Sequence, residues 1–72
     1  MPSHEYRAEM VANVLTVMVA VGDAVTTGDT LVMLESMKME IPVFADADGV
    51  VSAVSVRPGD VVQEGDVLTI VD

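Results

Sequence analysis

The sequence contains no cysteine and no tryptophan, and its aromatic residues are one tyrosine, Tyr6, and one phenylalanine, Phe44. Without cysteine, neither a disulfide framework nor a thiolate metal site can stabilise this chain of 72 residues. The fold must therefore be held together by the packing of apolar side chains in one small domain spanning residues 1–72. A chain without cysteine is also compatible with a reducing compartment, so we expect a cytoplasmic protein.

Positive charge is scarce as well. Arg7, Lys38 and Arg57 stand against twelve Asp and Glu residues, which gives a net charge of -9. Binding to nucleic acid requires a cluster of Lys or Arg that neutralises several phosphates, and three scattered cations do not supply one. The same shortage argues against anionic membrane surfaces. We therefore expect neither nucleic acid nor a membrane as a partner.

Long apolar runs are missing too. Gly, Asp or Thr interrupts every valine-rich stretch within about ten residues, whereas a helix that spans a bilayer needs about 20 apolar residues. Residues 1–5 show no basic region followed by an apolar core, so we expect no signal peptide there and a frayed N-terminus.

What the chain does contain is an internal repeat. A shift of 37 residues, the separation of Gly22 and Gly59, aligns residues 17–31 with residues 54–68 without a gap. Both Gly-Asp pairs, the valine between them and the leucine after them coincide. They are Gly22-Asp23, Val25, Gly28-Asp29 and Leu31 in the first half, and Gly59-Asp60, Val62, Gly65-Asp66 and Leu68 in the second. Two halves of this kind usually pair about a pseudo-twofold axis.

The residue pattern of each half predicts short strands separated by tight turns. Valines alternate with other residues at 15–21 and 50–56, and β-branched side chains favour strands. Further strands are expected at about residues 30–35, 39–45 and 67–71, with Pro42 at a sheet edge or beside a bulge. The prediction is an all-β fold, a flattened barrel-sandwich of two antiparallel four-stranded sheets with pseudo-twofold symmetry.

Lys38 is the single lysine and lies at the join of the two halves. Strands run into and out of residues 35–40, so Lys38 is expected on the hairpin turn, with both termini at the opposite end of the molecule. A lysine at such a tip is ordinarily a solvated residue. Met37 and Met39 flank it, however, and exposed methionines at a turn often mark a surface for a partner. We interpret Lys38 as an attachment point.

At these residues the chain resembles a known family. Glu35-Ser36-Met37-Lys38-Met39 is similar to the Ala-Met-Lys-Met motif of biotinyl domains, and the Gly-Asp runs match the same family from about residue 7 to residue 72. The resemblance implies that a biotin protein ligase attaches biotin to the ε-amine of Lys38, with Met37 and Met39 as flanking recognition residues. It also implies a biotin carboxyl carrier that shuttles a carboxyl group from a biotin carboxylase to a carboxyltransferase, without catalytic residues of its own.

Two alternatives stay open at this point. In the related lipoyl domains the lysine usually follows Asp and precedes Ala, so methionine on both sides favours biotin over lipoate. An unmodified interaction module could instead use the Met37-Lys38-Met39 hairpin to bind a partner directly. Residues 9–14 depart from the Pro-Met-Pro-Gly-like stretch of many biotinyl domains, and the gapless repeat leaves no residues for a thumb loop. The expected protein is a small thumbless carrier, a monomer that starts at Met1 as a free-standing chain, without a metal site.

Overall fold

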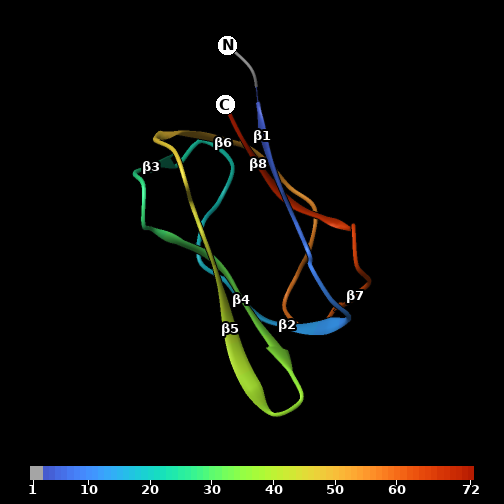
Figure 1. Ribbon diagram of the computed structural model, residues 1–72. Helices are drawn as coiled ribbons and strands as arrows, with labels where there is room; N and C mark the ends of the chain where they lie inside the picture. The colour runs from blue at the N-terminus through green and yellow to red at the C-terminus, as the bar shows by residue number, and fades with distance from the viewer. Residues whose placement is uncertain (1–2) are drawn as a thin grey trace.

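The computed structural model describes residues 3–72, which form eight short β-strands and no helix (Figure 1). The strands are β1 (His4–Arg7), β2 (Ala12–Val17), β3 (Ala24–Val25), β4 (Thr30–Ser36), β5 (Met39–Phe44), β6 (Gly49–Val54), β7 (Val61–Val62) and β8 (Val67–Val71). A search of the described residues for a helix long and apolar enough to cross a membrane finds none.

The strands form two four-stranded sheets, in the orders β1-β8-β6-β3 and β5-β4-β2-β7, and all their pairings are antiparallel. The prediction of an all-β fold with two antiparallel four-stranded sheets is therefore confirmed. Pro42 pairs with Met33 from the edge strand β5, where its missing N–H leaves no gap in a ladder. Its predicted position at a sheet edge is confirmed as well.

Aliphatic side chains of both halves fill the space between the sheets. Leu31 and Leu68, which are equivalent in the repeat, are each 0% exposed, and Val14 and Val51 form a second equivalent pair. Valine suits such positions because its branched Cβ restricts χ1 and packs well on a pleated surface. The small core is thus built twice from the same residue types.

Backbone hydrogen bonds repeat in the same way. The N–H of Gly22 donates to the carbonyl of Val51, and the N–H of Gly59 donates to the carbonyl of Val14, both at 2.8 Å. Gly22 and Gly59 have φ values of 96° and 95°, a left-handed conformation in which glycine has no Cβ to clash. The Gly-Asp pairs therefore fold as matching turns.

The structural repeat extends beyond the residues that coincide in sequence. Strand β1 pairs with β8 as β5 pairs with β4, and the registers correspond. The pairs His4↔Val71, Glu5↔Ile70 and Tyr6↔Thr69 are equivalent to Ile41↔Leu34, Pro42↔Met33 and Val43↔Val32. The N-terminal strand thus occupies in one sheet the place that β5 occupies in the other. The corner equivalent to the β4–β5 hairpin falls between the two chain ends.

The two termini lie at one end of the molecule and the β4–β5 hairpin at the other, as expected (Figure 1). The expectation of a frayed N-terminus is wrong for His4 and Glu5, which pair with Val71 and Ile70 in β8. The Ser3 hydroxyl also donates a hydrogen bond to the Asp72 carboxylate. Residues 1–2 lie outside the described residues.

Candidate functional site

Lys38 lies in a two-residue turn between β4 and β5. The register pairs Ser36 with Met39, which leaves Met37 and Lys38 as the loop. Their φ values are 54° and 65°. Positive φ at both central residues of a two-residue hairpin is the signature of a type I′ turn, whose twist matches that of the flanking strands. The predicted hairpin position of Lys38 is confirmed, and the turn type fixes how its side chain leaves the sheet.

The turn is unusual in its residue types. Type I′ turns strongly prefer Asn-Gly, because a left-handed conformation costs an ordinary residue roughly 1–2 kcal/mol. Met37 and Lys38 adopt it nevertheless, held by the six residue pairs of the β4–β5 ladder. Backbone strain of this kind is common at functional sites, which makes this turn a candidate site. Neither turn position holds glycine or asparagine, so the type I′ turn could not be predicted from the sequence.

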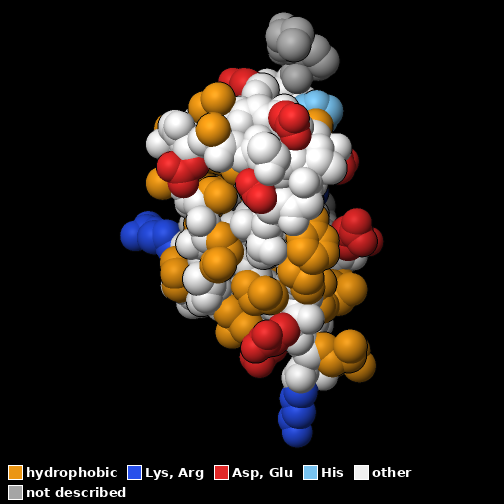
Figure 2. Space-filling model, turned by 90° about the vertical axis from the view of Figure 1, so that its left-hand side faces the viewer, with side chains coloured by type: hydrophobic (Ala, Val, Ile, Leu, Met, Phe, Trp, Pro, Cys, Tyr) orange, Lys and Arg blue, Asp and Glu red, His pale blue; other side chains and the backbone are white. Residues whose placement is uncertain are grey.

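The tip of the hairpin is open to solvent. Met37 is 91% exposed and Met39 66% exposed, so the turn presents two methionine side chains on either side of the amine. In Figure 2 a positively charged side chain extends from the hairpin end of the molecule. Across residues 3–72 the one salt bridge joins Arg7 to Glu5 at 2.6 Å, so the Lys38 amine is not held by a carboxylate. Lys38 is itself exposed, so its amine is open to solvent.

The base of the hairpin is tied to the β1–β2 connection. The Ser36 hydroxyl donates a hydrogen bond of 3.1 Å to the carbonyl of Val11. Val11 and its neighbour Met10 are 56% and 44% exposed, so this contact adds apolar surface beside the hairpin. The structure thus adds Ser36, Met10 and Val11 to the site, and sequence reasoning had assigned them no role.

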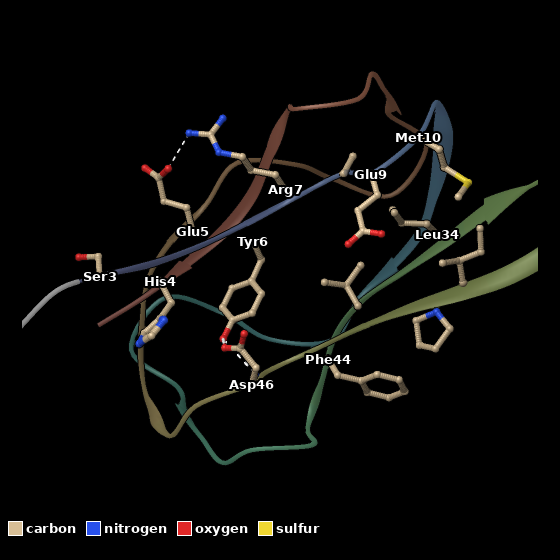
Figure 3. Close-up of a pocket in the computed structure, with 14 residues that line it drawn as sticks. Ser3, His4, Glu5, Tyr6, Arg7, Glu9, Met10, Leu34, Phe44 and Asp46 are labelled. Carbon is tan, nitrogen blue, oxygen red and sulfur yellow. Dashed lines mark hydrogen bonds and ion pairs between the residues drawn. The ribbon is translucent and has the colours of Figure 1, made fainter.

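A groove of about 690 Å³ runs between the edge strands β1 and β5 (Figure 3). Tyr6 lines the groove, and its hydroxyl donates to Oδ1 of Asp46 at 2.7 Å and accepts from the Asp46 N–H at 3.0 Å. Burial raises the pKa of Tyr6, and the hydrogen bond to the Asp46 carboxylate raises it further. This contact joins the two sheets across the groove.

The aspartates of the Gly-Asp pairs act as turn residues. Asp23 accepts a hydrogen bond from the N–H of Ala20, and Asp60 accepts the equivalent bond from Arg57, both at 2.9 Å. Asp29 and Asp66 do the same in the second turn of each half. Within residues 3–72 no three His, Asp or Glu side chains converge in a metal-binding arrangement.

The family is shown by a comparison with protein-family models. The biotin/lipoyl model, described as "Biotin-requiring enzyme", matches residues 3–71, which is nearly the whole chain. The chain therefore belongs to the biotin/lipoyl attachment family, as its resemblance to biotinyl domains implied.

Individual relatives agree with this assignment. The "Biotinylated protein TB7.3 homolog" of Mycobacterium leprae is 55% identical over 69 residues, which cover 96% of this chain and 97% of that protein. A solved long-chain acyl-CoA carboxylase, described as single-chain and multi-domain, contains a similar fold with a TM-score of 0.88 and 34% identity; the match covers 94% of this chain and 7% of the carboxylase. The lipoyl domain of the Azotobacter vinelandii 2-oxoglutarate dehydrogenase complex matches with a TM-score of 0.78 and 25% identity, covering 93% of this chain and 95% of that domain.

Proposed function

We propose that this chain is a biotin carboxyl carrier, with biotin attached to Nζ of Lys38. The observation that carries the proposal is the single lysine of the chain at the tip of a type I′ turn, exposed and free of any ion pair within the described residues. Such an amine fits a group that is attached covalently and must then reach into the active sites of other proteins.

Attachment forms one amide bond. In the proposed reaction a biotin protein ligase presents biotinyl-adenylate, and Nζ of Lys38 attacks its carbonyl carbon. AMP leaves with the electrons of the broken C–O bond, and the amine proton passes to the ligase or to water. The sequence around Lys38 offers no obvious base for this step, so the chain is the substrate of the ligase. Met37 and Met39 would contact the ligase through their exposed side chains.

The bound biotin supplies the capacity to carry a carboxyl group from a biotin carboxylase to a carboxyltransferase. The chain itself presents the arm. Its rigid sheets and two-residue turn keep the attachment point ordered, and the covalent link raises the local concentration of the carried group at each site. We propose that the chain works as a cytoplasmic monomer that contacts the ligase, the carboxylase and the carboxyltransferase transiently.

Two lines of support favour biotin over lipoate. Methionine stands on both sides of Lys38, whereas lipoyl domains usually carry Asp before and Ala after the lysine. The M. leprae relative, whose match covers 96% of this chain, is described as biotinylated, and the lipoyl domain is the less similar of the two solved structures described above.

A Lys38→Arg variant tests the proposal. Arginine keeps the positive charge and the length of the side chain, so the fold should be unchanged, but its guanidinium does not form the amide. After incubation with biotin, ATP and a biotin protein ligase, we expect streptavidin to retard the parent chain and not the variant in gel electrophoresis. Streptavidin binding by a folded Lys38→Arg protein would overturn the assignment of Lys38.

A further inference from the structure

The groove between β1 and β5 is symmetric in its backbone and asymmetric in its side chains. Because the repeat relates β1 to β5, Tyr6 is equivalent to Val43. The same shift of 37 residues relates Asp46, which follows β5, to Glu9, which follows β1. Each half of the groove therefore has one side chain on an edge strand, Tyr6 or Val43, and one carboxylate that follows the opposite edge strand, Asp46 or Glu9.

In the half nearer the termini both positions are used. The ring of Tyr6 fills the space and is 9% exposed, and its hydroxyl donates to Asp46 at 2.7 Å (Figure 3). The Tyr6 hydroxyl and the Asp46 carboxylate are therefore paired with each other in that half.

In the half nearer Lys38 the equivalent contact is missing. Val43 stands at the position equivalent to Tyr6, where the strand register is the same, so this half has neither the aromatic ring nor the hydroxyl. Glu9 makes no hydrogen bond or ion pair with the residues 3–72, and its side chain extends into the groove in Figure 3. The walls are Met10, Leu34 and Ile41, which are apolar, and Met10 is 44% exposed and flexible enough to move aside.

We propose that this half-groove receives a tyrosine side chain of the enzyme that binds the Lys38 hairpin, with the phenol hydroxyl donating to the Glu9 carboxylate. The apolar walls fit its ring, and the Glu9 carboxylate, which is exposed and has no partner among the described residues, can accept from its hydroxyl. Ile41 is three residues from Lys38 along β5, roughly 10 Å at about 3.3 Å per residue, so a partner at the hairpin also reaches the groove. Tyrosine is a frequent anchor at interfaces because its apolar ring carries a polar tip.

A substitution within the chain tests whether a tyrosine side chain fits this half-groove. A Val43→Tyr substitution places the ring on the backbone position equivalent to Tyr6, and Val43→Phe is its matched control without the hydroxyl. We expect Val43→Tyr to unfold at a higher temperature than Val43→Phe, and the difference to disappear when Glu9 is also changed to Ala. Equal melting temperatures of the two variants, or a difference that survives Glu9→Ala, would overturn the proposed contact.

A small probe tests the empty half-groove in the unsubstituted chain. We expect 4-methylphenol, which has the shape of a tyrosine side chain, to shift the amide NMR signals of Glu9, Ile41 and Val43 saturably. Toluene should bind about tenfold more weakly because it has no donor, and Val43→Tyr should abolish binding of both. Shifts elsewhere, equal binding of both compounds, or tighter binding of butylammonium as a lysine analogue would each contradict the proposal.

The last step concerns the partner, and here alone the inference rests on the proposed carrier function. Val43→Tyr should raise the KM for the carrier several-fold with the biotin protein ligase or with the biotin carboxylase, whereas Val50→Tyr on exposed β6 should change neither. An unchanged KM with both enzymes would overturn docking in this groove. Lys38 is intact in these variants, so that result would leave the carrier function standing, whereas failure of the parent chain to be biotinylated would refute the carrier function itself.

Discussion

Met37 and Lys38 hold a left-handed backbone that neither residue favours. The β4–β5 ladder holds this turn in place, and the methionine beside the lysine remains 91% exposed. Tyr6, in contrast, is buried, and its hydroxyl both donates to the Asp46 carboxylate and accepts from the Asp46 N–H. The proposed attachment site is thus strained and exposed, whereas the Tyr6–Asp46 contact is buried on the tyrosine side and fully hydrogen-bonded.

Replacing Met37 by glycine should separate stability from recognition. Glycine adopts φ near 54° without a Cβ clash, so we expect the free energy of unfolding to rise by about 0.5–1 kcal/mol. The rate of biotinylation should fall, because the ligase loses a methionine contact. Urea unfolding and ligase kinetics measure the two effects. Met39→Gly is the control: Met39 lies in β5, where glycine destabilises, and a loss of stability in Met37→Gly as well would contradict the strain.

The hydroxyl of Tyr6 should contribute to stability in a pH-dependent way. We expect Tyr6→Phe to lower the free energy of unfolding by about 1 kcal/mol at neutral pH, because Asp46 loses its partner. Since the pKa of Tyr6 is raised above 10.0 in the folded chain, the unfolded chain releases this proton first as the pH rises. Stability should therefore be complete below pH 10.0 and decline above it.

Urea unfolding of both proteins at about pH 8 and about pH 10.5 checks this prediction. The difference in stability between parent and Tyr6→Phe should shrink at the higher pH. A difference that stays constant or grows with pH would show that the hydroxyl is not held in its protonated form by the fold.

At the scale of strands and turns, the Gly-Asp pairs and the aliphatic residues around them were sufficient to predict two matching halves, because glycine is needed at positive φ and leucine in the core. The exact strand lengths were not predictable. Alternation of valines continues to Val21, yet β2 ends at Val17, since the chain then turns and the carboxylate of Asp23 binds the N–H of Ala20. Strand β1 has little sequence likeness to β5, so its equivalence emerged from the register alone.

Gly49 is required by a close backbone contact, whereas the equivalent position in the first half holds Ala12. A Cβ at this position would lie 2.2 Å from the carbonyl oxygen of Asp72 and 2.7 Å from a methyl group of Val71. Gly49→Ala should therefore push β6 away from the end of β8 and cost about 2 kcal/mol. Gly22→Ala meets nothing within 4 Å and is strained only by its φ, so we expect about 1 kcal/mol. Thermal unfolding ranks the two, and a smaller loss for Gly49→Ala would contradict the close approach.

The whole molecule is elongated, with principal extents of 35 × 18 × 17 Å, and its two ends differ. Ser3 and Asp72 meet at one end, and the β4–β5 hairpin, whose turn contains Lys38, lies at the other. A longer chain joined at either terminus would therefore leave the lysine free, which agrees with the similar fold that makes up 7% of the acyl-CoA carboxylase chain. The net charge of -9 adds electrostatic repulsion between copies of the chain.

Attachment of biotin to Lys38 can be measured from the intact mass of the chain. The chain is incubated with ATP, biotin and a biotin protein ligase, and in parallel with lipoate and a lipoate ligase, and the modified residue is located by fragmentation. We expect a gain of one biotinyl group, on Lys38, and no lipoyl group. A folded chain that gains no biotin, or that gains lipoate in its place, would contradict it.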